Sequence, residues 1–243
     1  MIQIVDDVSE VPIMEISVII PTYNEELTIT RTLDALSRLV NVSEIVIVDG
    51  GSTDKTVEIV ENYAHKKPFR LVKIAGANRG QQLHEGTKYA SGDVFWFLHA
   101  DTRPVQGCAG QIKQYMRYDE IVGGNFEIVF DGKRRWARFL TWLYPQLRSI
   151  GLVYGDSAMF VRREIYEKIG GFRNLPLFED VDLYKKLLKK GEFRHINLPV
   201  TTSSRRFENS SFIWTFARWS IFQGLYWFGV PPRLLAKKYK AIR

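Results

Sequence analysis

The sequence predicts an α/β fold in which a mostly parallel sheet carries helices on both faces. Residues 16–20, 44–49 and 94–98 are short apolar runs without polar alternation, the pattern of strands buried on both faces. Segments with helical periodicity separate these runs along the chain. Each run is also followed by polar residues. Because the carboxyl ends of parallel strands meet at one edge of a sheet, these polar ends predict a ligand-binding crevice there.

The elements of the first half follow in order from this pattern. A helix is expected from Glu25 or Glu26 to Arg38, and its apolar face consists of Ile29, Leu33, Leu36 and Leu39. Ser52 or Thr53 is expected to cap the next helix, which ends near residue 66. A strand at 70–75 and a helix that opens in the glycine-containing loop 76–80 and ends near residue 90 complete the unit.

After Asp101 the strict alternation of strands and helices stops. Helices are expected at 107–118, 134–147, 163–169 and 180–190, and strands at 121–130, 156–161 and 193–197. Residues 212–228 form an aromatic segment, and a basic tail follows it. The chain is therefore divided into a lead-in at 1–15, a catalytic domain at 16–210 and a C-terminal aromatic helix with a basic tail at 211–243.

Composition limits the classes of protein to which the chain can belong. Its 243 residues, 45% of them hydrophobic, fit one large domain with a full core. The single cysteine, Cys108, excludes an internal disulfide framework. Residues 1–15 contain four acids and do not resemble a secretory leader, so a cytoplasmic location is expected. The net charge of +7 favours anionic partners, but charge alone is weak support for nucleic-acid binding, which we do not expect.

The segment from Asp49 to Asp54 carries the most specific chemical pattern. Gly50 and Gly51 permit a tight turn and the close approach of a ligand to the backbone. Asp49, at the end of a strand, is able to accept hydrogen bonds from a base or a ribose. Asp54 stands at a helix start, where the helix dipole favours a carboxylate. An ordinary strand–turn–helix cap is the alternative interpretation.

Five ordered motifs resemble those of glycosyltransferase family 2, whose members use nucleotide sugars and have the GT-A fold. The motifs are Val18–Glu25, Val46–Asp54, Asn78–Gln82, His99–Asp101, and the pair Gly170–Phe172 and Phe178–Asp180. The resemblance covers about residues 16–210. It implies a Rossmann-like sheet with a smaller acceptor-side region, and a divalent metal ion, Mn²⁺ or Mg²⁺, as cofactor. His99 departs from the family's Asp-x-Asp metal motif, which leaves the identity and affinity of the metal open.

The resemblance also assigns roles to individual residues. A nucleoside-diphosphate sugar, with a UDP-type donor favoured, is expected to contact Pro21, Tyr23, Asn24, Glu25, Asp49, Gly50, Asp54, Arg79, Gln81, Asp101, Arg205 and Arg206. Asp101 and His99 are the expected metal ligands. Asp180 is the expected general base and Glu179 its catalytic neighbour, with Gly155 and Asp156 on the acceptor side. For Arg79, Arg205 and Arg206 the alternative is an ordinary surface arginine, and for the two acids it is an acidic helix start.

The activity expected from these residues is inverting transfer of a sugar to a hydroxyl acceptor, and a lipid-linked acceptor is left open. A sugar nucleotidyltransferase is disfavoured, because Thr22–Glu25 lacks the glycine-rich basic loop of those enzymes. A non-catalytic nucleotide-sugar or lipid-binding protein of the same fold remains the second alternative, since His99 replaces an acid. The aromatic segment 212–228 has three expected partners: the domain itself, a second subunit in a homodimer, or a membrane surface that the protein contacts peripherally.

Overall fold

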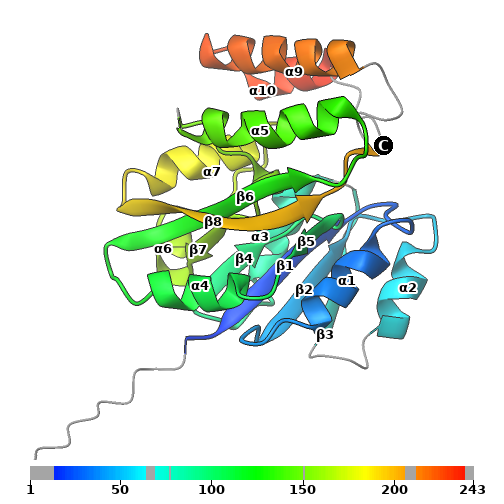
Figure 1. The fold of residues 1–243 in the computed structure, drawn as a ribbon. Helices are drawn as coiled ribbons and strands as arrows, with labels where there is room; N and C mark the ends of the chain where they lie inside the picture. The colour runs from blue at the N-terminus through cyan, green and yellow to red at the C-terminus, as the bar shows by residue number, and fades with distance from the viewer. Residues whose placement is uncertain (1–13, 64–68, 77, 150, 206–211, 239–243) are drawn as a thin grey trace, which may run out of the picture.

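A computed structural model describes residues 14–63, 69–76, 78–149, 151–205 and 212–238. Within them the strands form one eight-stranded sheet with the order β3-β2-β1-β4-β7-β6-β8-β5 (Figure 1). The pairs β1–β2, β2–β3, β1–β4 and β6–β8 are parallel. Strand β7 runs antiparallel to both β4 and β6, and β5 runs antiparallel to β8. The expected mostly parallel α/β sheet is therefore confirmed, with an antiparallel strand in its middle.

The first half alternates strands and helices as the sequence predicts. Its elements are β1 (Ile16–Thr22), α1 (Ile29–Ser37), β2 (Glu44–Asp49), α2 (Thr56–Tyr63), β3 (Phe69–Lys73), α3 (Arg79–Thr87) and β4 (Val94–Phe97). Helix α1 begins later than expected, because residues 25–28 form hydrogen-bonded turns before it. The residues between β1 and α1 therefore contact the loop that follows β2.

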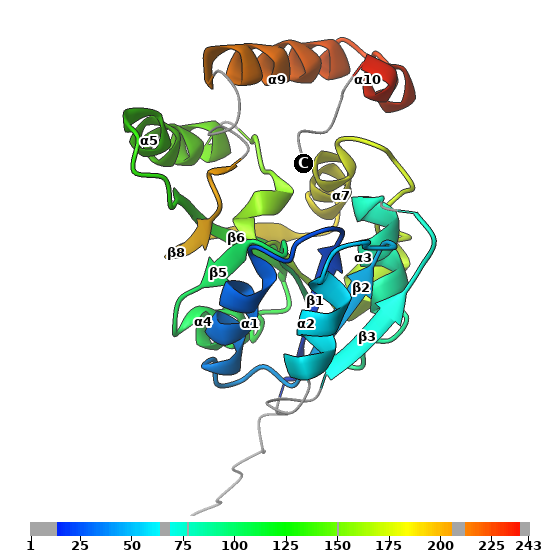
Figure 2. The same cartoon turned by 90° about the vertical axis from the view of Figure 1, so that its right-hand side faces the viewer.

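The core lies on both faces of the central strands. In β1, Ile16, Val18 and Ile20 face a cluster that includes α1, α2 and α4, whereas Ile19 faces the cluster that includes α3, α6 and α7. All four side chains are buried. Figures 1 and 2 show the two helical layers on either side of the sheet. Burial on both faces explains why these strands are apolar without alternation.

The second half departs more from the expected elements. It contains β5 (Thr102–Pro104), α4 (Cys108–Tyr115), β6 (Ile121–Phe130), α5 (Arg135–Ser149), the 3₁₀ turn η1 (Gly155–Ser157), β7 (Phe160–Arg162), α6 (Arg163–Lys168), α7 (Glu179–Leu187), β8 (Glu192–Thr202), α9 (Phe212–Trp227) and α10 (Pro232–Lys238). Strand β5 was not predicted, since three residues give no periodic signal. Strand β8 is longer than expected and pairs with β6 through a register shift between Phe126 and Glu127.

The strand predicted at 156–161 is wrong in its first half. Gly155, Asp156 and Ser157 form η1, and Ala158 has a φ of 54°, in the left-handed region. The buried indole of Trp96 donates a hydrogen bond to the carbonyl of Ala158, which holds the turn against β4. This turn redirects the chain, so that Gly155 and Asp156 lie at the edge of the sheet where the parallel strands end.

The C-terminal aromatic segment forms α9, which lies across α5 and α7 at one end of the domain (Figure 2). Phe212 stacks on Trp136 of α5, and Tyr226 stacks on Phe178 just before α7. The short helix α10 follows α9, so the first part of the expected basic tail is helical. None of the described helices is long and apolar enough to span a membrane.

Candidate active site

The loops after β1 and β2 are joined by hydrogen bonds. Ser52 Oγ accepts from the backbone N–H of Asn24 at 2.9 Å, and Asn24 Oδ1 accepts from the backbone N–H of Thr53 at 2.9 Å. Asn24 has a φ of 54°, a conformation that asparagine adopts more readily than most residues. Asp54 accepts from the N–H of Glu26 at 3.1 Å. The two loops are therefore one unit along the edge of the sheet.

Asp49 organises the turn that follows β2. Its carboxylate accepts hydrogen bonds from the N–H groups of Gly51 and Ser52, each at 2.9 Å, and from the Ser52 and Thr22 hydroxyls at 2.5 and 3.2 Å. A carboxylate offers about four acceptor positions, so these bonds engage all of them. The direct contact of Asp49 with a base or a ribose stays a prediction, and what the structure shows is that Asp49 stabilises the turn at Gly51 and Ser52.

Gln82 has a structural role that the sequence did not indicate. Its side-chain amide donates to the backbone carbonyls of Thr22 and Val48, both at 2.8 Å, and thereby joins the ends of β1 and β2. Gln82 is buried, whereas its neighbour Gln81 is exposed at the first turn of α3. Asn78 caps that turn by accepting from the backbone N–H of Gln81. In the sequence, only the capping residue Asn78 marks the start of α3, and it does not indicate the role of Gln82.

Arg79 and two acids of α7 form an ion-pair cluster. The guanidinium of Arg79 donates to the buried Glu179 carboxylate, and its Nη2 lies 3.5 Å from Asp180 Oδ2. Burial tends to lower the pKa of Arg79, but Glu179 and Asp180 raise it, so the guanidinium stays cationic. Phe178, directly before α7, has a φ of 63°. This strained residue turns the chain so that both acids enter the site at the start of the helix.

Asp180 is the buried carboxylate at the centre of this cluster. Its Oδ2 accepts from the N–H of Gly155 at 2.6 Å, and its Oδ1 accepts from the N–H of Val181 at 2.8 Å. Burial raises the pKa of Asp180 above the ordinary aspartate range, Arg79 opposes this and Glu179 adds to it. With Arg79 as the third partner, about one of the four acceptor positions of the carboxylate remains for a substrate.

Gly155 separates Asp180 from His99. A methyl group added at Gly155 would lie 3.1 Å from His99 Nε2 and 3.2 Å from Asp180 Oδ2. His99 Nδ1 contacts Asp156 Oδ1 at 2.8 Å, and its Nε2 faces Arg79 Nη1 at 3.4 Å. In the turn η1, Asp156 therefore orients His99, and Gly155 positions Asp180.

Asp101 lies in the turn after β4, beside Glu25 and Arg205. Arg205 pairs with Glu25 and also lies 3.7 Å from Asp101 Oδ2. Burial raises the pKa of Asp101, and the neighbouring acids Asp156 and Glu25 raise it further, against His99 and Arg205. Arg206, which was also expected to contact the nucleotide sugar, lies outside the described residues.

Asp101 and His99, which the resemblance assigns to a metal ion, offer one carboxylate and one imidazole, the donor types of a partial ligand set. Among the described residues, no three His, Cys, Asp or Glu side chains form a group that could hold a metal ion. Mg²⁺ is commonly held by one or two carboxylates together with substrate phosphates, so a complete protein cage is not required. The Asp156–His99 contact resembles the carboxylate that orients a metal-bound histidine, but Nε2, the ring nitrogen left for an ion, faces Arg79 Nη1 at 3.4 Å, so an ion could bind there only after Arg79 moved. Asp101 and His99 would be the two ligands.

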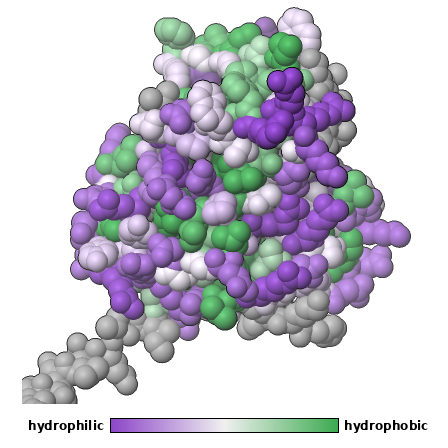
Figure 3. Space-filling view, viewed as in Figure 1, coloured by the Kyte–Doolittle hydropathy of each residue, from purple (hydrophilic) through white to green (hydrophobic). Residues whose placement is uncertain are grey.

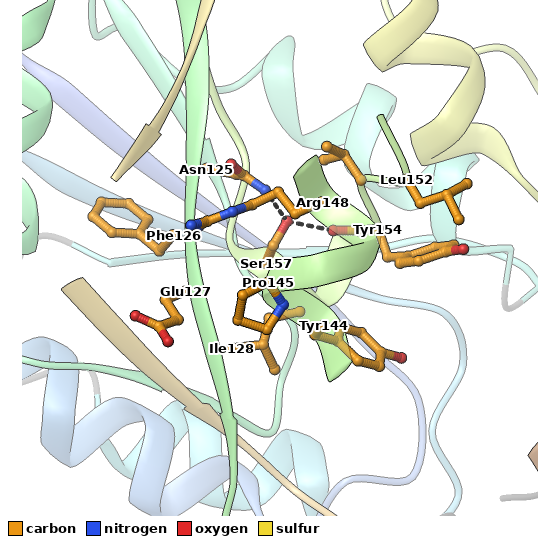
Figure 4. A pocket seen from close by; sticks show the side chains of 11 residues that line it. Asn125, Phe126, Glu127, Ile128, Tyr144, Pro145, Arg148, Leu152, Tyr154 and Ser157 are labelled. Carbon is orange, nitrogen blue, oxygen red and sulfur yellow. Dashed lines mark hydrogen bonds between the residues drawn. The ribbon is translucent and has the colours of Figure 1, made fainter. Parts of the chain in front are cut away.

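A hollow of about 280 Å³, counting space open to solvent, lies among these groups. Its lining combines the charged cluster with apolar residues: Arg79, Leu83, Phe97, His99, Gly155, Met159, Phe172, Glu179 and Asp180. A second hollow of about 250 Å³ is lined by Ser157 of η1 together with residues of β6 and α5 (Figure 4). There Ser157 accepts from Asn125 and donates to the carbonyl of Tyr154, with Arg148 alongside. The turn η1 thus contributes Gly155 to the first hollow and Ser157 to the second.

The Gly155→Ala variant is expected to lose about ten- to 10²-fold in turnover, because the new methyl group would displace His99 or Asp180 by a fraction of an ångström. Gly110→Ala is the matched control, since a methyl group there meets nothing within 4 Å and a helical alanine is favoured. Steady-state kinetics and the melting temperature would be measured for both. Unchanged turnover in a folded Gly155→Ala protein would remove the positioning role.

The structure brings one part of the predicted site residues into a single cluster. Contacts link His99, Asp156, Gly155, Arg79 and the two α7 acids, whereas Asp101 belongs to a second group with Glu25 and Arg205. Others of the predicted set lie along the same edge of the sheet, at the strand ends or in the loops that follow them, namely Pro21, Tyr23, Asn24, Glu25, Asp49, Gly50 and Asp54. Pro21 is still within β1, opposite Val48, and is partly buried. Their contact with a nucleotide stays a prediction.

A family model described as "Glycosyl transferase family 2" matches residues 17–170. A "Probable glycosyltransferase YdaM" from Bacillus subtilis is 28% identical over 208 residues, which are 76% of this chain and 49% of that protein. An "Undecaprenyl-phosphate 4-deoxy-4-formamido-L-arabinose transferase" from Pseudomonas paraeruginosa is 31% identical over 179 residues, 69% of this chain and 52% of that protein. The chain spans about half the length of these relatives.

Solved structures share the fold at low sequence identity. TarS 1–349 of Staphylococcus aureus in complex with UDP-GlcNAc matches with a TM-score of 0.67 and 20% identity, over 79% of this chain and 59% of that one. The mannosyltransferase PcManGT from Pyrobaculum calidifontis, in complex with GDP-Man and Mn²⁺, matches with a TM-score of 0.61 and 20% identity, over 76% of this chain and 56% of that one. The GT-A type of fold that the sequence motifs implied is confirmed.

Proposed function

The chain belongs to glycosyltransferase family 2, and we propose that it transfers a sugar from a nucleoside-diphosphate sugar to a hydroxyl acceptor with inversion at the anomeric carbon. The observation that carries this proposal is the buried Asp180, which is fixed by Gly155 and keeps about one acceptor position for a substrate. A carboxylate with a raised pKa at a partly enclosed site is suited to general-base catalysis.

In the proposed reaction Asp180 takes the proton of the acceptor hydroxyl. The acceptor oxygen then forms a bond to the anomeric carbon while the bond from that carbon to the diphosphate oxygen breaks. The nucleoside diphosphate leaves with the electron pair of the broken bond. A single in-line displacement of this kind inverts the anomeric configuration. Glu179 holds Arg79 beside the reacting groups and is the second catalytic acid that we propose.

The donor is proposed to lie along the carboxyl ends of β1, β2 and β4. The joined loops that contain Asn24 and Asp49 would hold the nucleoside, and Arg79 and Arg205 would meet the diphosphate. Both arginines pair with carboxylates in this structure, so the diphosphate would compete with Glu179 and Glu25 for them. Arg206 and Gln81 are proposed to assist. A UDP-type donor is favoured because the neighbour TarS was solved with UDP-GlcNAc.

A divalent ion, when bound, offsets the charge of the departing diphosphate as a Lewis acid. Asp101 would supply an anionic oxygen to that ion and His99 a ring nitrogen, with Asp156 orienting the imidazole. One structural neighbour was solved with GDP-Man and Mn²⁺. Mn²⁺ accepts imidazole more readily than Mg²⁺ does, so the replacement of an acid by His99 favours Mn²⁺.

The acceptor is proposed to be a hydroxyl compound that lies between α7, η1 and α9. Tyr154 precedes η1, and its buried hydroxyl has no hydrogen-bond partner among the described residues. The buried amide of Gln223 on α9 also lacks a partner there. Two such groups would be satisfied by the polar part of an acceptor. A lipid-linked acceptor is the form we favour, in line with the name of the undecaprenyl-phosphate transferase among the relatives.

The proposal is tested with UDP-, GDP- and dTDP-sugars in the presence of Mn²⁺. The correct donor is expected to raise the melting temperature, since a ligand that binds the folded state stabilises it by RT ln(1 + [L]/Kd). With water as a slow substitute acceptor, NMR should show that the sugar is first released with inverted configuration. A product with retained configuration would contradict the mechanism. Donor binding without any turnover would instead support a non-catalytic nucleotide-sugar-binding protein.

A further inference from the structure

The outer face of α9 is apolar and exposed. Ile213 and Trp214 are 74% and 77% exposed, and Phe228, just after the helix, is 90% exposed. Ile221 and Leu225 are exposed between them. At 100° per residue these five side chains fall on one side of the helix. Figure 3 shows apolar side chains gathered over α9 at the top of the molecule.

The opposite face of α9 is already occupied by the domain. Trp219 packs edge-on against Tyr154 with ring centroids 4.9 Å apart, and Tyr226 stacks on Phe178 at 4.5 Å. Thr215 and Gln223 are buried on the same side. The apolar outer face therefore does not pack against the core of this domain. Contiguous exposed apolar surface of this kind marks an interaction site.

The charge around this face is of one sign. The sequence has no Asp or Glu in residues 133–154 or 212–238, the segments that contain α5, α9 and α10. The same segments contain nine cations: Lys133, Arg134, Arg135, Arg138, Arg148, Arg218, Arg233, Lys237 and Lys238. Arg233, Lys237 and Lys238 are exposed on α10, next to α9. A partner for this face should be apolar at its centre and anionic around it.

We propose that the outer face of α9 docks on the surface of an anionic lipid bilayer. The helix would lie in the plane of the interface, with its apolar residues among the acyl chains and the cations of α10 at the phosphates. Tryptophan is favoured at that depth. A second copy of the chain is a poor alternative, because it would bring two sets of cations together.

This docking goes beyond the proposed transfer reaction, but it has a consequence for it. Tyr226 contacts Phe178, which directly precedes the acids of α7, and Trp219 contacts Tyr154, which directly precedes Gly155. A bilayer on the outer face of α9 would therefore lie one helix away from the acceptor side of the site. A hydroxyl carried by a membrane lipid would reach Asp180 around the edge of that helix.

The test is co-sedimentation with vesicles of phosphatidylcholine, with and without phosphatidylglycerol. The full chain is expected to bind the anionic vesicles and to bind the neutral ones much more weakly. The triple variant Arg233→Gln/Lys237→Gln/Lys238→Gln should bind anionic vesicles on the order of 10²-fold more weakly, since each cation near such a surface contributes about a fivefold factor. The variant Trp214→Ser/Ile221→Ser/Phe228→Ser should lose at least about tenfold.

Matched controls lie on and next to α1, at the far end of the domain (Figure 1). Leu27 and Val40 are 80% and 77% exposed, and Arg31 and Arg38 are also exposed. Leu27→Ser/Val40→Ser and Arg31→Gln/Arg38→Gln should leave vesicle binding unchanged. All binding is measured without donor and repeated in Asp180→Asn, so the result does not depend on the transferase activity.

Equal vesicle binding by the wild type and the α9 variants would overturn the proposal, as would the absence of binding to anionic vesicles. Analytical ultracentrifugation provides the second measurement. A wild-type dimer that dissociates in Trp214→Ser/Ile221→Ser/Phe228→Ser would assign the face to a second copy of the chain and would likewise overturn it. A monomer in both proteins, with vesicle binding lost only in the variant, is the supporting result.

Discussion

The Asp180→Asn variant is expected to lose about 10²–10⁴-fold in kcat while it retains near-normal affinity for the nucleotide. The asparagine side chain has almost the shape of aspartate and can still accept the hydrogen bond from Gly155, but it cannot take up a proton. Isothermal titration with the nucleoside diphosphate and single-turnover kinetics would separate binding from chemistry. Asp180 bonds to Gly155, Val181 and Arg79 rather than to the loops proposed to hold the nucleoside, and Arg79 would keep its pair with Glu179 in the variant, which is why the two effects should be separable.

Asp182 provides a matched control on the same helix. It is also buried and pairs with Arg173 and Lys186, away from the hollow that contains Asp180. Asp182→Asn should lower the melting temperature through the loss of those pairs but leave kcat within a few-fold of the wild type. If the Asp180→Asn protein were fully active, another acid would be the general base, and Glu179 and Asp156 are the next candidates.

The pH dependence gives a further readout of the same group. Burial raises the pKa of Asp180, and a base is inactive when it is protonated. Activity should therefore fall as the pH decreases through a pKa above the ordinary aspartate value of about 3.9. This acidic limb should be present in the wild type and absent from the residual activity of Asp180→Asn. A limb of identical position in both proteins would mean that another group controls it.

Asp101→Asn is expected to abolish the stimulation of activity by divalent ions. An amide cannot supply the anionic oxygen that a hard cation requires, and His99 alone would be a weak site. Turnover would be measured while Mn²⁺ or Mg²⁺ is titrated into protein treated with a chelator. Mn²⁺-dependent turnover equal to that of the wild type would contradict the assignment of Asp101.

Two comparisons make this prediction specific. His99→Ala should shift the concentration of Mn²⁺ needed, or the preference between the two ions, without removing the stimulation. Asp93→Asn is the control for the substitution itself, because Asp93 is an exposed carboxylate at the opposite end of the sheet that accepts from the backbone of Glu15. Its response to metal ions should equal that of the wild type.

The sequence alone determined the strand core and the order of the motifs. Strands β1, β2 and β4 are buried on both faces, so they must consist of apolar residues without alternation, and that pattern is local and visible. The ends of these strands are adjacent in any parallel sheet. For that reason the sequence is sufficient to place Asp49, His99 and Asp101 at one edge of the sheet.

The arrangement of charges at that edge was decided only by the tertiary structure. Arg79 and Asp180 are separated by about a hundred residues in the chain, and their contact depends on the packing of α3 against α7. The turn η1, with Ala158 at a positive φ, and the strained Phe178 arise because the surrounding core overrides local preference. The same applies to Gln82, whose side chain joins two strands through backbone carbonyls that no motif marks. Local pattern thus fixed which residues stand at the strand ends, whereas long-range packing fixed which of them are paired, buried and able to react.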